Sequence, residues 1–134
     1  MTVTPAEIPE LLRIAKTVAV VGISDKPDRA SYGVSQYLLE NSHFELFFVN
    51  PLLEEVLGQK VYKSLKDIPV HIDIVDVFRK PADCLAVLEE SIEIEASAIW
   101  LQLGISVPEV ATRGEEAGLK VVMDRCIKID YAAL

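Results

Sequence analysis

The sequence predicts an α/β fold in which helices cover both faces of a parallel, doubly wound sheet. Short apolar runs rich in β-branched residues alternate along the chain with segments whose apolar residues recur at helical spacing. The apolar runs have no polar face, which is typical of strands buried on both sides of a sheet. With 134 residues and 51% hydrophobic content, the chain can build one substantial core, and we expect residues 1–134 to form a single domain.

A capping box near the N-terminus predicts the first helix. Thr4 and Glu7 have the spacing of that motif, and Pro5 occupies the first helical position. One apolar stripe follows at helical spacing: Ile8, Leu11, Leu12 and Ala15. We expect the first strand over residues 18–21 and the second helix over residues 30–41.

The middle of the chain is predicted to contain a strand and a long connection. The second strand covers residues 45–50 and has an aromatic, β-branched centre. The connection at residues 52–69 contains a turn at 58–60 and one capped helical turn at 64–67. Little crossover helix is therefore expected here.

Three further strands and two helices complete the predicted fold. The third strand covers residues 72–78, and a helix then begins at Pro81. The fourth strand covers residues 97–101, before a helix that begins near Pro108. The fifth strand covers residues 120–123, and the alternation of strands and helices favours parallel pairing throughout.

Residues 17–33 form the stretch around which the remaining sequence is arranged. Its apolar strand changes within a few residues into a polar loop, and Gly22 stands where a side chain would obstruct the approach of backbone. The next helix begins near residues 30–31 and directs its amide end back toward Gly22. Because Lys26 and Arg29 lie in between, this stretch favours a ligand that carries phosphate groups.

Ligands bind to such sheets outside the carboxyl ends of the strands, near the point where the strand order reverses. The candidate residues at these ends are Gly22, Ser24, Lys26 and Arg29 after the first strand, Asn50 and Pro51 after the second, Arg79 and Lys80 after the third, Gln102 and Gly104 after the fourth, and Asp124, Arg125 and Cys126 after the fifth. Five of the 13 basic residues of this acidic chain converge there. His43 and His71 precede their strands and belong to the opposite edge, so neither is a good catalytic candidate.

A nicotinamide dinucleotide is one alternative ligand, since a strand that ends in glycine before a helix is also typical of NAD-dependent enzymes. The spacing from Gly22 to Gly33 is much longer than that of G-x-G-x-x-G. The second strand ends in Asn50, where an acidic residue would hold the ribose hydroxyls of NAD. The long polar loop better suits a nucleotide with an additional 3′-phosphate, such as coenzyme A.

Five segments together resemble one known family, the small stand-alone coenzyme A-binding domain proteins. They read Val-Val-Gly-Ile-Ser, Val-Asn-Pro, Asp-Val-Phe-Arg-Lys-Pro, Trp-Leu-Gln-Leu-Gly and Val-Met-Asp-Arg-Cys-Ile. The resemblance covers nearly the whole chain. It implies a Rossmann-like, three-layer α/β/α fold with a five-stranded parallel sheet, similar to the N-terminal domain of the succinyl-CoA synthetase α chain.

The resemblance also implies a ligand, coenzyme A or an acyl-CoA, and the residues that bind it. Gly22, Ser24, Lys26, Pro27 and Arg29 would take the phosphates, Asn50 and Pro51 would border the pantetheine or the adenosine, and Val77, Phe78 and Arg79 would line the next part of the groove. Ser31, Tyr32, Gln102 and Gly104 complete the expected cofactor-binding residues. The later domain of the synthetase, with its phosphorylated histidine, has no counterpart here, so the resemblance transfers binding and not catalysis.

Other functions stay open beside a coenzyme A binder. The chain could be an NAD(P)-dependent oxidoreductase, or a non-catalytic subunit of an acyl-CoA ligase. It could also be an interaction module whose nucleotide pocket has decayed. At the level of residues, Lys26 and Arg29 could simply pair with Asp25 and Asp28 on a solvated loop, and residues 79–80 could cap a strand end.

The two cysteines are expected to be reduced thiols, because they are too few for a disulfide framework and too far apart for a metal knuckle. Cys84 lies in a helix and reads as a small buried hydrophobe. Cys126 lies on the ligand edge beside Arg125, a cation that would favour its thiolate, although a structural role is still favoured.

The net charge of −8 argues against nucleic acid and anionic membranes as partners, because the summed field repels both. The longest uncharged segment, residues 96–108, is too short to cross a bilayer, and residues 1–5 lack the pattern of a secretory signal. We therefore expect a cytoplasmic protein with a small-molecule nucleotide ligand. Whether it forms a homo-oligomer or has a protein partner stays open.

Overall fold

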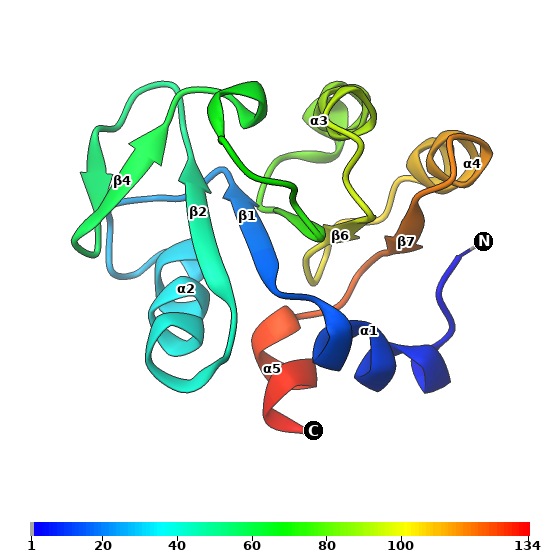
Figure 1. Ribbon diagram of the computed structural model, residues 1–134, viewed down its shortest axis with the longest axis horizontal. Helices are drawn as coiled ribbons and strands as arrows, with labels where there is room; N and C mark the ends of the chain where they lie inside the picture. The colour runs from blue at the N-terminus through cyan, green and yellow to red at the C-terminus, as the bar shows by residue number, and fades with distance from the viewer. Residues whose placement is uncertain (1) are drawn as a thin grey trace.

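A computed structural model describes residues 2–134 and has three layers, with one sheet between two groups of helices (Figure 1). The strands are β1 (Thr17–Val21), β2 (Glu45–Val49), β3 (Glu55–Val56), β4 (Gln59–Tyr62), β5 (Ile74–Val77), β6 (Ala98–Leu101) and β7 (Lys120–Val122). Their order across the sheet is β3-β4-β2-β1-β5-β6-β7. All neighbours pair in parallel except β3 and β4, which form an antiparallel hairpin.

The strand order reverses at β1. This strand pairs with β2 on one side and with β5 on the other. From β1 the chain runs outward to β2 and β4, returns to β5, and then continues outward to β6 and β7. The carboxyl ends of β1 and β5 therefore mark the switch point where a ligand site is expected.

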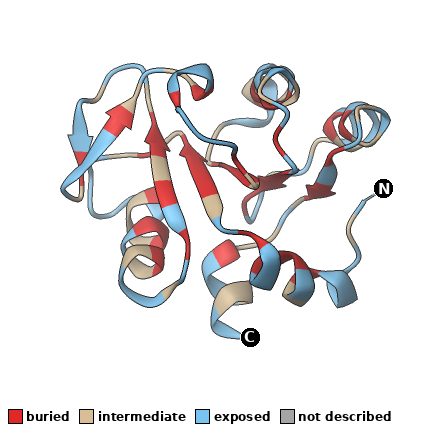
Figure 2. Cartoon of the chain, viewed as in Figure 1, coloured by how far each residue is buried: buried red, intermediate tan, exposed pale blue. Residues whose placement is uncertain are grey.

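The helices divide between the two faces of the sheet. They are η1 (Pro5–Glu7), α1 (Ile8–Ile14), α2 (Ala30–Asn41), η2 (Leu65–Asp67), α3 (Pro81–Glu93), α4 (Pro108–Glu116) and α5 (Ile127–Ala132). Helices α1, α2 and α5 cover one face, and α3 and α4 cover the other (Figure 1). Because both faces are covered, the central strands are buried along nearly their whole length (Figure 2).

The prediction of a five-stranded sheet is wrong by two strands. The five expected strands are present as β1, β2, β5, β6 and β7, and the hairpin of β3 and β4 extends the sheet beyond β2. The hairpin turns at Leu57 and Gly58, which both have positive φ, of 52° and 73°. Strands of two and four residues are too short to show a period of two, so only the turn near Gly58 was recognised.

Helix α5 was not predicted from the sequence. It has only six residues, and its N-cap residue, Cys126, makes no side-chain capping bond that would mark its start. It packs onto the sheet through Ile127, which is fully buried. This helix forms one wall of the pocket described below.

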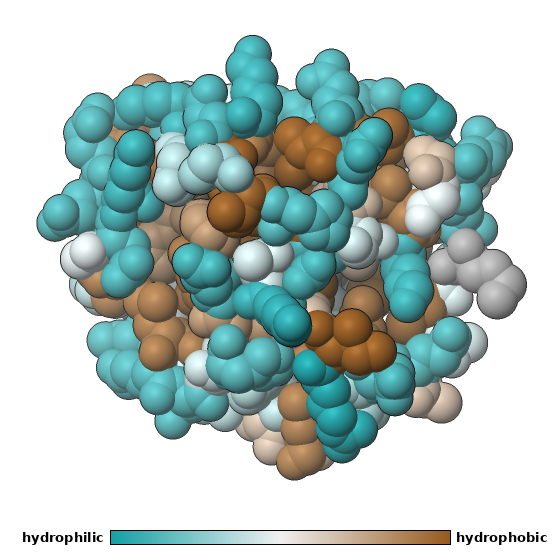
Figure 3. Space-filling model, in the orientation of Figure 1, coloured by the Kyte–Doolittle hydropathy of each residue, from teal (hydrophilic) through white to brown (hydrophobic). Residues whose placement is uncertain are grey.

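The surface of the protein is mostly hydrophilic on the face seen in Figure 3, where hydrophobic side chains form separate patches. Single exposed apolar side chains are common on folded proteins. Among the described helices, none combines the length and the apolar character that a bilayer span needs.

Candidate ligand-binding site

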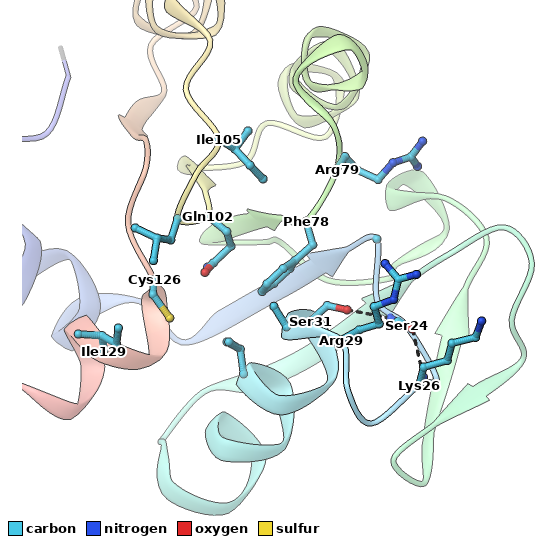
Figure 4. A pocket seen from close by; sticks show the side chains of 14 residues that line it. Ser24, Lys26, Arg29, Ser31, Phe78, Arg79, Gln102, Ile105, Cys126 and Ile129 are labelled. Carbon is cyan, nitrogen blue, oxygen red and sulfur yellow. Dashed lines mark hydrogen bonds between the residues drawn. The ribbon is translucent and has the colours of Figure 1, made fainter.

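An open pocket of about 570 Å³ lies at the carboxyl edge of the sheet, over the switch point. It is bounded by the loop after β1, the start of α2, the segments that follow β5 and β6, and α5 (Figure 4). The lining residues are Gly22, Ser24, Lys26, Arg29, Ala30, Ser31, Val34, Phe78, Arg79, Gln102, Leu103, Ile105, Cys126 and Ile129.

Gly22 allows the end of β1 to approach the segment after β5. Its φ is +91°, and a Cβ atom at this position would lie 2.5 Å from the Phe78 carbonyl oxygen. A backbone hydrogen bond also joins the two segments: the Phe78 amide donates to the Val21 carbonyl over 2.9 Å, which continues the pairing of β1 with β5. A side chain at position 22 would therefore collide with the backbone just after β5.

Two serines hold the loop between β1 and α2 in place. The Ser24 amide donates to the Ser31 hydroxyl over 3.0 Å, and the Lys26 amide donates to the Ser24 hydroxyl over 3.1 Å (Figure 4). Within the described chain, no side chain caps the first turn of α2. The amide end of this helix thus faces the pocket as a ready site for an anion.

Three cations lie at the end of the pocket next to the loop between β1 and α2. Figure 4 shows Lys26, Arg29 and Arg79 on the same side, away from α5. Arg79 is paired with Asp83 of α3, with 3.1 Å between Nη2 and Oδ2. Across residues 2–134, no carboxylate lies within ion-pair distance of Lys26 or Arg29, so the alternative in which nearby aspartates pair with them is not observed.

The opposite end of the pocket is apolar. It is formed by Ile105 and Ile129, together with the Cys126 thiol (Figure 4), and Leu103 is a further apolar residue of the lining. Leu103 and Ile129 are 64% and 61% exposed, which leaves hydrophobic surface open at the rim. The pocket therefore changes from cationic to apolar along its length.

Arg125, the cation that precedes Cys126, is paired with a residue of α5. Its guanidinium makes two hydrogen bonds of 2.8 Å to the carboxylate of Asp130, so its charge is already compensated. Cys84 is buried in α3, as predicted, and burial raises the pKa of its thiol.

A buried polar pair lies beneath the pocket. The side chain of Gln102, which is only 4% exposed, donates through Nε2 to Oδ1 of the fully buried Asp76. Burial raises the pKa of Asp76 to about 8, and the hydrogen bond from Gln102 lowers it only in part. Sequence reasoning missed Asp76, although one signal was available: a carboxylate in the middle of an apolar strand.

The structure brings together eight of the fourteen predicted site residues. Gly22, Ser24, Lys26, Arg29, Ser31, Phe78, Arg79 and Gln102 all line the pocket. Pro27, Tyr32, Asn50, Pro51, Val77 and Gly104 are outside its lining. The other lining residues are Ala30 and Val34 of α2, Leu103 and Ile105 after β6, and Cys126 and Ile129. Of these, only Cys126 was named from the sequence as a candidate at this edge.

The residues outside the lining have other contacts. Asn50 supports the loop after β1, because its Nδ2 donates to the Ile23 carbonyl over 2.8 Å. Val77 is fully buried in the core on the face covered by α3 and α4. The Gly104 amide donates to Oδ1 of Asp124 over 2.7 Å, which joins two loops.

Both histidines lie at the amino edge of the sheet, as predicted. The ring of His43 is within hydrogen-bond distance of the Tyr131 hydroxyl and of the Ala15 carbonyl. Nδ1 of His71 lies 3.2 Å from Oδ1 of Asp73. Neither residue reaches the pocket lining.

Comparison with known proteins identifies the family. The family model described as "CoA binding domain" matches residues 16–132, which is most of the chain. The chain belongs to the CoA-binding domain family. The resemblance inferred from the sequence motifs is thus confirmed.

Individual relatives agree with this assignment. An uncharacterized protein of Bacillus subtilis, YneT, is 43% identical over 127 residues, which cover 95% of this chain and 93% of that protein. The α subunit of an ADP-forming acetate–CoA ligase II from Pyrococcus furiosus is 40% identical over 57 residues, but these cover 42% of this chain and only 12% of the subunit. A hypothetical protein from Pyrococcus horikoshii has the same fold, with a TM-score of 0.93 and 39% identity over 98% of this chain and 92% of that one.

Proposed function

We propose that this protein binds coenzyme A or an acyl-CoA, with the phosphate groups at the cationic end of the pocket. One observation carries the proposal: Lys26 and Arg29, which have no carboxylate partner within residues 2–134, lie at the uncapped amino end of α2. Charge-assisted hydrogen bonds from such cations and helix amides are well suited to phosphate. The ligase α subunit, whose name includes CoA, supports the choice of ligand.

The rest of the ligand would extend toward α5. Beyond the cations, the lining offers the Phe78 ring, the Gln102 amide and then the apolar side chains of Ile105 and Ile129. A mixed lining of this kind, mostly apolar with few polar groups, suits the pantetheine arm and an attached acyl group. The exposed apolar rim leaves room for the acyl end.

A nicotinamide dinucleotide is the competing ligand. Asn50 weighs against it, because this amide supports the loop through Ile23 and Leu52 and is not part of the lining. Dinucleotide sites use an acidic side chain near this position to hold the ribose.

Thermal unfolding with a ligand series tests the proposal. Coenzyme A at a hundredfold excess over its dissociation constant should add about 2.7 kcal/mol to the stability of the folded protein. Removal of the 3′-phosphate should reduce the gain, because one charged group is lost from the cationic end. If NADH raised the melting temperature and coenzyme A did not, the protein would be a dinucleotide binder instead.

A further inference from the structure

Asp76 is a buried carboxyl group whose presence the stability of the fold does not explain. It lies in β5, where every residue is buried, and its register partners Val20 and Trp100 are fully buried apolar side chains. Its Oδ2 atom has no hydrogen-bond partner in the described chain. An unpartnered buried polar atom costs about 1–3 kcal/mol, and an apolar side chain here would avoid that cost.

The side chain of Gln102 links Asp76 to the pocket. Trp100 of β6 pairs with Asp76, and Gln102, two residues further on, projects on the same face of the sheet. Its Nε2 is bound to Asp76, while its oxygen lies in the space between Phe78 and Cys126 (Figure 4). No hydrogen bond to this oxygen is formed within residues 2–134, and Gln102 lines the pocket, so the oxygen is an acceptor that a ligand in the pocket can reach.

We propose that Asp76 is a positioning residue, which fixes the Gln102 amide so that its oxygen accepts a hydrogen bond from an amide N–H of the pantetheine arm. This inference rests on the proposed binding of coenzyme A. The two ends of a glutamine amide have nearly the same shape but opposite hydrogen-bonding character. Without the acceptor at Asp76, the amide can rotate and present its NH₂ group, which cannot accept from the ligand.

The same arrangement avoids a negative charge beneath an anionic ligand. Because burial raises the pKa of Asp76 to about 8, we expect this group to be mostly neutral at pH 7, and its carbonyl oxygen can still accept the hydrogen bond from Gln102. A neutral acid can therefore orient the amide without repelling the phosphates.

Two ligands separate this role from a purely structural one. Coenzyme A contains the pantetheine arm with its amide groups, whereas adenosine 3′,5′-bisphosphate has a nucleotide and phosphates but no arm. We expect Gln102→Leu and Asp76→Leu to weaken coenzyme A binding about tenfold, and to leave binding of the bisphosphate unchanged. Asp76→Asn keeps an oxygen acceptor and should bind coenzyme A as the wild type does.

Calorimetric titration at pH 7 of the wild type, the three variants and the double variant Asp76→Leu/Gln102→Leu decides the matter. The double variant should lose no more affinity than Gln102→Leu alone, because both changes remove one contact. Unchanged bisphosphate binding shows that each variant is folded. If Asp76→Leu fails to fold, Gln102→Leu and Asp76→Asn still test the role of the amide. If a variant lost affinity equally for both ligands, or if Gln102→Leu bound coenzyme A as tightly as the wild type, this inference alone would be overturned. If the wild type bound no coenzyme A, the proposed function would be overturned too.

Discussion

Lys26 and Arg29 are the residues on which the proposed phosphate site depends most. Each lies at the pocket without a carboxylate partner in the described chain, so its charge is available to a ligand. Lys26→Ala and Arg29→Ala should each weaken coenzyme A binding by roughly 1.5–3 kcal/mol, the value of a charge-assisted hydrogen bond. Isothermal titration calorimetry at low salt measures this.

The matched control is Lys66→Ala, which removes an exposed lysine of η2 that is outside the pocket lining. It should leave the affinity unchanged. The melting temperature of the ligand-free protein should also be unchanged in all three variants. If Lys26→Ala and Arg29→Ala bind coenzyme A as tightly as this control, both cations are merely solvated loop charges.

We expect Asp76 to make the stability of the protein depend on pH, in a direction that follows from its raised pKa. An unfolded aspartate titrates near pH 4, whereas the buried group keeps its proton until about pH 8. Between these values the native state binds one more proton than the unfolded state. As the pH rises through this window, the contribution of Asp76 to the free energy of unfolding falls by about 1.4 kcal/mol per pH unit.

Urea unfolding of the wild type and of Asp76→Asn at pH 5, 7 and 9 measures this contribution. The variant has no proton to lose at this position, so other titrating groups cancel in the comparison. We expect the wild type to lose stability relative to the variant as the pH rises. Parallel curves for the two proteins would mean that Asp76 titrates normally.

At the scale of elements, the sequence predicted the five central strands, helices α1 to α4 and the helical turn η2, but not the β3–β4 hairpin or α5. Buried parallel strands can be recognised in a sequence because they are short apolar runs between segments with helical periodicity. The β3–β4 hairpin and α5 contain too few residues for a periodic pattern, and contacts from distant parts of the chain hold them in place.

The site was predictable where it depends on strand ends. The carboxyl ends of parallel strands meet at one edge, so Gly22, Arg79 and Gln102 could be grouped from the sequence alone. Asn50 also follows a strand, yet its amide turns inward to the loop, and only coordinates reveal such a contact. Ile129 was missed because the helix that carries it was not predicted.

The join between β1 and the loop depends on one glycine, and α2 contains another that serves as its control. Gly22→Ala places Cβ 2.5 Å from a carbonyl oxygen at a φ of +91°, so we expect a loss of about 1–3 kcal/mol in the free energy of unfolding. Gly33→Ala lies inside α2 with nothing within 4 Å of the new Cβ, and should gain up to about 1 kcal/mol. Denaturant titration compares them; equal stability of the two variants would contradict the tight contact at Gly22.

Across the whole molecule, the distribution of charge is more informative than its sum. The chain has a net charge of −8, yet three cations line one end of the pocket. A local positive region on an acidic protein directs small anionic ligands to one place, while the overall field repels polyanions. The fold supplies this arrangement, because it brings the loop after β1 next to the segment after β5.

The most direct test of the central proposal is a two-dimensional NMR titration of the labelled protein with coenzyme A. It reports at once whether the ligand binds and where. We predict saturable shifts that are largest for the backbone amides of residues 22–32, 78–79 and 102–105, with little change at the opposite edge around His43 and His71. An absence of shifts at millimolar coenzyme A, or shifts centred on the histidine edge, would contradict the assignment of this pocket as the coenzyme A site.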